Sequence, residues 1–116
     1  LIFNTNITNN IITHYFRNQF ELKLPPVECN VELYLRVRFD DGVIVYLNGN
    51  EIANVGVPEN ADGNTLADVQ RLNARRVIYE EFKIDSSLLS NGGQQILSAE
   101  LHQSSMTSSD AGFDVL

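Results

Sequence analysis

Acidic side chains at two points of the chain have the chemistry of a calcium site. Asp40 and Asp41 stand side by side before Gly42, and Asp110 follows two serines near the end of the chain. Calcium takes about six to eight oxygen ligands at one place. Both acidic segments are expected at strand ends, where they can meet in space. The sequence therefore predicts a structural calcium site at Asp40, Asp41 and Asp110. The alternative is that the two aspartates close a turn and Asp110 accepts hydrogen bonds from backbone amides.

A second set of residues has the chemistry of a sugar-binding surface. Sugars are held by aromatic faces together with planar polar groups that fix their orientation. The predicted ligand-binding residues are Tyr46, Arg36, Tyr34 and Arg38. The alternative is that these tyrosines only cover sheet faces, with their hydroxyls in water. The chain has no Trp, which would be the strongest sugar platform.

Patterns that would indicate catalysis are lacking in the sequence. Glu100 and His102 are two residues apart on one face of a predicted strand, whereas zinc needs about three or four ligands. The pair is therefore expected to form hydrogen bonds with neighbouring loops. No Gly-x-Ser-x-Gly elbow of a serine hydrolase is present. Glu80 and Glu81 are adjacent, so they point to opposite faces of a strand and cannot form the carboxylate pair of a glycosidase. We therefore predict a protein that is not an enzyme.

Composition limits the domain count and the partners. The chain has 116 residues and a formal charge of −7, which suits one domain with one core. Negative charge argues against nucleic acid and membranes as partners, because both are bound through basic patches. Cys29 is the only cysteine, so no disulfide forms within the chain. The strand-like residues at both ends suggest a single domain, residues 1–116, that is excised from a longer chain.

Short alternating runs separated by Gly, Asn, Asp, Pro and Ser dominate the chain, and helical periodicity is nearly absent. Such alternation is typical of a β-sandwich or barrel. Residues 31–39 show it most clearly, with apolar Val37 and Phe39 on one face and Arg36 and Arg38 on the other. The predicted strands lie near residues 1–8, 13–22, 31–39, 43–47, 50–55, 77–84, 94–102 and 112–116.

The segment 31–55 is predicted to form a three-stranded meander. Asp40, Asp41 and Gly42 supply the first turn, in which Gly42 takes a positive φ. Asn48-Gly49 supplies the second, a two-residue type I′ turn. The resulting register places an Arg36–Tyr46–Glu51 row on the solvent face. The predicted cross-strand pairs are Phe39 with Val43, Val37 with Val45, Arg36 with Tyr46, Tyr46 with Glu51, Val45 with Ile52 and Leu47 with Asn50.

An ordered set of short segments resembles a known family. The segments are YFR at 15–17, DDG at 40–42, VYLNG at 45–49, ELHQSS at 100–105, SSD at 108–110 and FD at 113–114. Together they resemble an accessory module of secreted bacterial proteins, which include phosphoesterases, spore-coat-like kinases and lamin-tail proteins. By this resemblance, which covers about residues 13–116, the chain is similar to galactose-binding-like jelly rolls. One departure is NGGQQILS at 91–98, where a Gln replaces the usual Asn of a turn.

The resemblance implies an all-β, antiparallel jelly-roll β-sandwich of about eight strands without catalysis. Ligands in the wider superfamily are mostly glycans, and calcium is often structural. We therefore expect a noncatalytic, secreted or cell-surface accessory module, directed at a glycan or cell-surface polymer and linked to neighbouring domains. The alternative is a structural or self-assembling repeat of an extracellular polymer or adhesin, because unpaired strand edges invite pairing with a neighbour.

The calcium site can be tested by removing the metal. A cation that binds only the folded state stabilises it, so chelation is expected to lower the melting temperature. Thermal unfolding in calcium and in chelator measures the effect. Equal melting temperatures in the two conditions would rule out a structural calcium ion.

Overall fold

The protein is all-β within the residues that its computed structural model describes, which are 3–5, 11–22, 32–68, 79–91, 93–105 and 112–115. Among these residues no helix is long and apolar enough to cross a membrane. The elements are β1 (Phe3–Thr5), β2 (Thr13–Glu21), β3 (Leu33–Asp40), β4 (Gly42–Leu47), β5 (Asn50–Val55), β6 (Glu80–Ile84), the 3-10 helix η1 (Ser86–Leu88), β7 (Gln94–His102) and β8 (Gly112–Val115).

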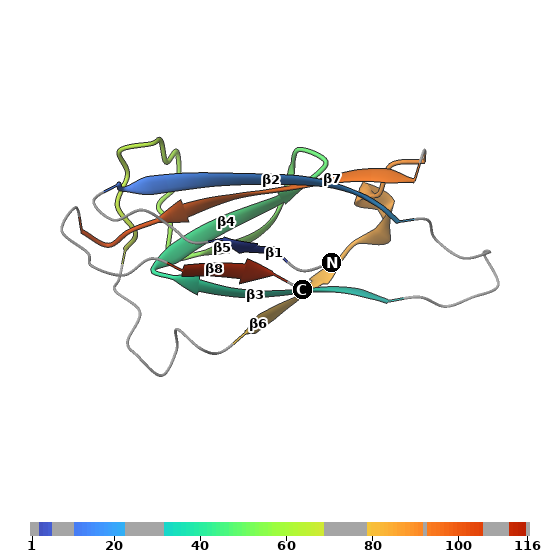
Figure 1. Ribbon diagram of the computed structural model, residues 1–116, viewed down its shortest axis with the longest axis horizontal. Coiled ribbons are helices and arrows are strands. Elements are labelled where there is room, and N and C mark those ends of the chain that lie inside the picture. Colours follow the sequence, from blue (N-terminus) through green and yellow to red (C-terminus); the bar gives the residue numbers. More distant parts are fainter. Residues whose placement is uncertain are drawn as a thin grey trace.

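The strands form two antiparallel sheets arranged as two layers (Figure 1). The first sheet has the order β1-β8-β3-β6, and the second has the order β2-β7-β4-β5. The longest pairing joins β2 to β7, from Thr13 opposite His102 to Glu21 opposite Gln94. The all-β prediction is confirmed, and each predicted strand has a counterpart whose ends differ by a few residues.

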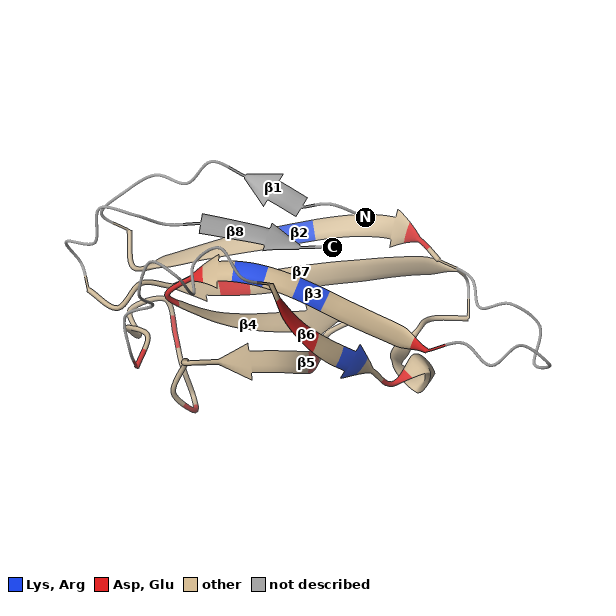
Figure 2. Ribbon diagram, turned by 90° about the horizontal axis from the view of Figure 1, so that it is seen from below, with Lys and Arg blue, Asp and Glu red and all other residues tan. Residues whose placement is uncertain are grey.

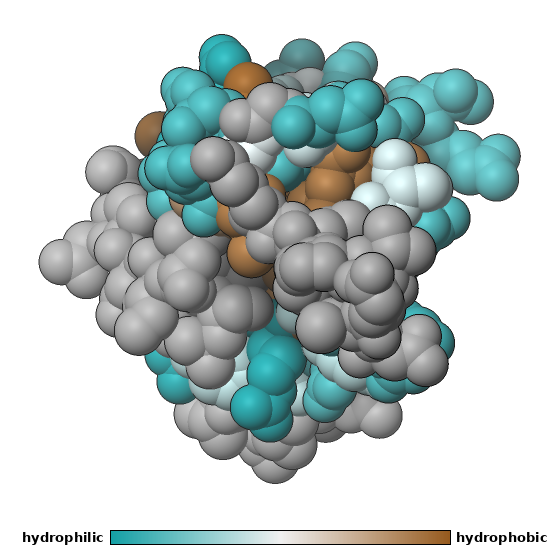
Figure 3. All heavy atoms as spheres, turned by 90° about the vertical axis from the view of Figure 1, so that its right-hand side faces the viewer, coloured by the Kyte–Doolittle hydropathy of each residue, from teal (hydrophilic) through white to brown (hydrophobic). Residues whose placement is uncertain are grey.

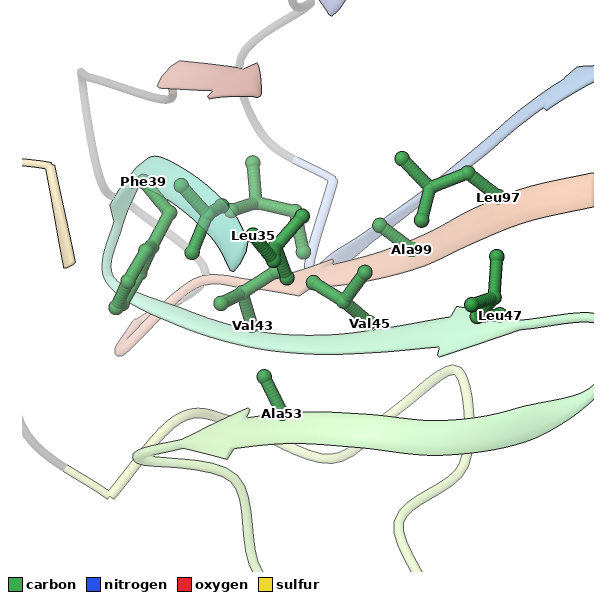
Figure 4. Packing of buried hydrophobic residues seen from close by; sticks show 10 residues of the cluster. Leu35, Phe39, Val43, Val45, Leu47, Ala53, Leu97 and Ala99 are labelled. Atoms are coloured by element: carbon green, nitrogen blue, oxygen red, sulfur yellow. The ribbon is translucent and has the colours of Figure 1, made fainter. Parts of the chain in front are cut away.

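The core lies between the two sheets and follows the predicted period of two. β3, β4 and β7 each contribute every second residue to it, and Ala53 of β5 joins them (Figure 4). Val37, Val43, Val45 and Leu101 are completely buried. Burying a side chain of this size contributes about 1.5–3 kcal/mol. The buried cluster consists of Leu35, Val37, Phe39, Val43, Val45, Leu47, Ala53, Leu97, Ala99 and Leu101.

The predicted meander is wrong at its first turn. β3 and β4 belong to different sheets, so Asp40–Gly42 is a corner between the layers and not a hairpin turn. Arg36 pairs with Glu81 of β6 and therefore does not reach Tyr46. A hairpin and a corner bury the same alternate residues, which is why the pattern could not distinguish them.

The second turn is confirmed. Asn48 and Gly49 both have positive φ, at 51° and 84°, as a type I′ turn requires. Tyr46 pairs with Glu51 as predicted. Val45 pairs with Ala53 and not with Ile52, because a bulge shifts the register between Val45 and Tyr46.

Gly42 serves close packing and not the predicted positive φ, since it is not among the described glycines with that conformation. A Cβ at this position would lie 2.9 Å from the carbonyl oxygen of Gly56 and 2.9 Å from the Cβ of Ala67. The missing side chain therefore lets the loop 56–68 lie directly on the sheet at the corner.

Gln95, the residue at the departure from the family pattern, ties three segments together. Its side chain is fully buried. The Oε1 atom accepts hydrogen bonds from Asn48 Nδ2 (2.7 Å) and the Ser90 amide (2.8 Å). The Nε2 atom donates to the carbonyls of Leu22 (3.1 Å) and Ser90 (3.2 Å). The side-chain amide thus accepts two and donates two hydrogen bonds, and these join the β4–β5 turn, the end of β2 and the segment after η1.

We predict that Gln95→Ala lowers the free energy of unfolding by about 2–4 kcal/mol, because buried partners lose their hydrogen bonds. Chemical denaturation measures the loss. The neighbouring Gln94→Ala is the control, since within the described part of the chain its exposed side chain bonds only Gln19, at 3.3 Å. This variant is expected to cost no more than about 0.5 kcal/mol. Equal losses for the two variants would contradict the assigned role of Gln95.

Candidate functional site

The outer face of the β2-β7-β4-β5 sheet carries a group of polar and aromatic side chains. Because side chains alternate along a strand, residues opposite each other on neighbouring strands share a face. Tyr15 of β2 is 63% exposed, and Tyr46 of β4 is half-buried. The side chains fall into two cross-strand rows, Tyr15–Glu100–Ile44 and Arg17–Ser98–Tyr46.

A groove of about 320 Å³ lies among these side chains. It is at the small end of the range for ligand sites, about 300–1,000 Å³. Ser98 lies between the larger Arg17 and Tyr46 in its row, and its short side chain leaves the space that forms the groove. The groove is lined by Tyr15, Phe16, Arg17, Tyr46, Ser98, Ala99 and Glu100.

The loop 56–68 covers the adjoining part of the same face (yellow-green in Figure 1). The Ala67 amide donates to the Gln103 carbonyl (2.8 Å), and the Asp68 amide donates to the Gly56 carbonyl (2.7 Å). Ile44 points outward from β4 but is only 5% exposed. A Cβ added at Gly63 would lie 3.3 Å from the Tyr15 hydroxyl, so this loop also borders the groove.

His102 is completely buried next to this loop. Its Nδ1 atom is 2.6 Å from the Thr65 carbonyl oxygen and 3.2 Å from the Thr13 hydroxyl. On the other side of the ring, Nε2 is 3.5 Å from Oε2 of Glu100. That contact is within ion-pair distance, but it does not have the geometry of a hydrogen bond. His102 thus links the loop to a carboxylate of the groove.

Tyr46 presents a neutral hydroxyl in the groove. Burial raises the pKa of Tyr46, and the charges of Glu100 and Glu51 raise it further. A hydrogen bond between the Tyr46 hydroxyl and the Glu100 carboxylate acts in the same direction. Because phenols ionise only near pH 10 even without such effects, the hydroxyl remains a donor to Glu100 at neutral pH.

The four predicted ligand-binding residues lie on two opposite faces. Tyr46 is in the groove, whereas β3 carries Tyr34, Arg36 and Arg38 on the other sheet, where charges of both signs gather (Figure 2). Tyr34 donates a hydrogen bond to Glu32 (2.7 Å). Arg36 is 4.0 Å from Glu81, and the Arg38 guanidinium is 5.3 Å from the Tyr79 ring centre. The structure therefore does not bring these three residues together with Tyr46.

The predicted calcium ligands Asp40 and Asp41 are at the corner between the sheets, 5% and 2% exposed. Oδ2 of Asp41 accepts a hydrogen bond from the Ser104 amide (2.9 Å). Asp110 and Cys29 lie outside the described residues. Among the residues with a described position, no three His, Cys, Asp or Glu side chains form a group that could hold a metal ion.

Sequence reasoning did not assign Arg17 and Ser98 to a site, and it considered Glu100 for zinc or for hydrogen bonds to neighbouring loops. Alternation along the predicted strands places Ser98 and Glu100 on the face away from the core, and it allows the same assignment for Arg17. Their grouping with Tyr46 required the order of β2, β7 and β4 in the sheet. That order joins segments about eighty residues apart in sequence, and local patterns carry little information on such pairing.

A larger hollow of about 570 Å³ lies at the other end of the molecule. Figure 3 shows that end, with apolar atoms visible between polar ones. The described residues that line it include no charged or aromatic side chain. The groove on the sheet is therefore the better candidate for recognition of a polar ligand. The hollow is lined by Leu22, Ser86, Ser87, Leu89, Ser90, Asn91 and Gly93.

Comparison with known proteins finds no match, either among protein-family models or among curated proteins and solved structures.

Proposed function

We propose that the protein is a noncatalytic accessory module that binds a glycan in the groove of the β2-β7-β4-β5 sheet. The observation that carries the proposal is the composition of this groove. Two tyrosines from different strands flank Arg17, Ser98 and Glu100. Aromatic surface combined with a few fixed polar groups is what sugar recognition requires.

The fold proposed for this module is a galactose-binding-like jelly roll. A jelly roll has eight strands in two sheets, built from Greek keys. The strand orders β1-β8-β3-β6 and β2-β7-β4-β5 support it, because most neighbours in each sheet are distant in sequence and the chain passes between the layers. The resemblance of the sequence segments supports the same assignment.

Structural calcium and a secreted or cell-surface location belong to the same proposal. The carboxylates of Asp40 and Asp41 support this part of the proposal, because both lie at one corner between the sheets and carboxylate oxygens are ligands that calcium prefers. Asp110 is the third proposed ligand. The module would be one domain of a larger extracellular protein whose other domains supply any catalysis.

Glycan binding is tested on an array of cell-surface and polysaccharide glycans, followed by titration of the strongest ligand. Tyr15→Ala is expected to weaken binding about tenfold, because stacking on the exposed ring is lost. Tyr34→Ala is the matched control. It removes a similarly exposed tyrosine, 46% against 63%, from the opposite sheet and should leave affinity unchanged.

Two results would contradict the proposal. The first is an array with no glycan above background, which, together with multimers that grow with concentration, would favour the self-assembling repeat instead. The second is a loss of affinity in Tyr34→Ala equal to that in Tyr15→Ala, which would exclude the groove as the binding site.

A further inference from the structure

The electrical charge of the groove determines which sugars it favours. Two charged side chains line it, Arg17 from β2 and Glu100 from β7. The formal charges of these two side chains, one positive and one negative, sum to zero. The surroundings of the two side chains differ, because the Glu100 carboxylate faces the buried ring of His102.

The hydrogen bond to the loop decides which ring nitrogen of His102 carries a proton. The Thr65 carbonyl oxygen can only accept, and it is 2.6 Å from Nδ1. Nδ1 therefore carries a proton and donates it to this oxygen. In a neutral ring Nε2 would then have a bare lone pair.

Glu100 is engaged on two sides within this face. Its Oε2 atom is 3.5 Å from Nε2 of His102, an atom that is sealed from solvent. The Tyr46 hydroxyl is its second partner. The carboxylate of Glu100 is thus already held by two neighbours.

Arg17 is the other charged residue that lines the groove, and its guanidinium is not engaged in this way. In the described part of the chain it forms no ion pair with an acidic side chain. Glu51, the partner of Tyr46, is exposed on β5, which is separated from β2 by two strands.

We propose that the groove binds an acidic oligosaccharide and that Arg17 pairs with the carboxylate of one of its uronic-acid units. Arginine matches a carboxylate with two parallel hydrogen bonds. Tyr15 and Tyr46 lie on strands separated by β7, about 10 Å apart across the sheet, so they suit stacking on different rings of one sugar chain. This inference rests on the proposed glycan binding and adds the class of sugar.

The test compares each acid with a matched neutral ligand. Tetragalacturonate and tetramannuronate are titrated into the protein beside their methyl esters, which keep the rings and remove the charge. At least one acid is expected to bind about tenfold more tightly than its ester. Arg17→Gln should abolish that preference while keeping binding of the ester. Added salt should reduce the preference in the unaltered protein.

Arg36→Gln is the matched control, because Arg36 is an exposed arginine of the opposite sheet beside Glu81. It should retain the full preference for the acid. Esters that bind as well as both acids, or a preference that survives Arg17→Gln, would overturn the inference. If neutral glycans bind in the groove and neither acid does, only the acidic ligand class is wrong. If no glycan binds at all, both this inference and the proposed function are wrong.

Discussion

The imidazole of His102 fastens the loop 56–68 to the outer face of one sheet. Its Nδ1 atom donates to the Thr65 carbonyl at 2.6 Å, and its other nitrogen faces Glu100. The ring is completely buried, so the loss of either partner would leave a polar atom without water. Gly42 makes this arrangement possible, because any side chain there would collide with the loop backbone at Gly56.

The same contact divides the outer face into two parts. At one end the loop covers Ile44 and His102, and at the other the small side chain of Ser98 leaves a hollow between larger neighbours. The core side of this sheet is mainly apolar, and its buried cluster fixes the position of the strands. The strands thus supply a rigid base, and the loop and Glu100 determine the chemistry displayed on it.

Local patterns predicted much of this architecture. Alternation located the strands and the inward residues such as Val37 and Val45. The Asn48-Gly49 pair predicted the type I′ turn that the structure has at these two residues. Alternation does not distinguish the corner at Asp41 from a hairpin turn, because a corner and a hairpin bury the same residues. The predicted hairpin therefore placed Arg36 wrongly beside Tyr46. For Glu100 and His102 the sequence leaves two interpretations, a sparse metal motif or hydrogen bonds to neighbouring loops, and the structure shows His102 bonded to the Thr65 carbonyl. The loop that supplies the carbonyl could not be predicted, because every residue carries a backbone carbonyl.

The proton on Nδ1 of His102 is the feature on which the attachment of the loop 56–68 to the sheet depends. Long-range proton–nitrogen correlation spectra of the labelled imidazole rings measure it directly. The account predicts that at neutral pH Nδ1 is protonated and hydrogen-bonded to Thr65, and that Glu100→Gln changes the Nε2 signal while Nδ1 stays protonated. An Nδ1 signal typical of an unprotonated nitrogen would contradict the account.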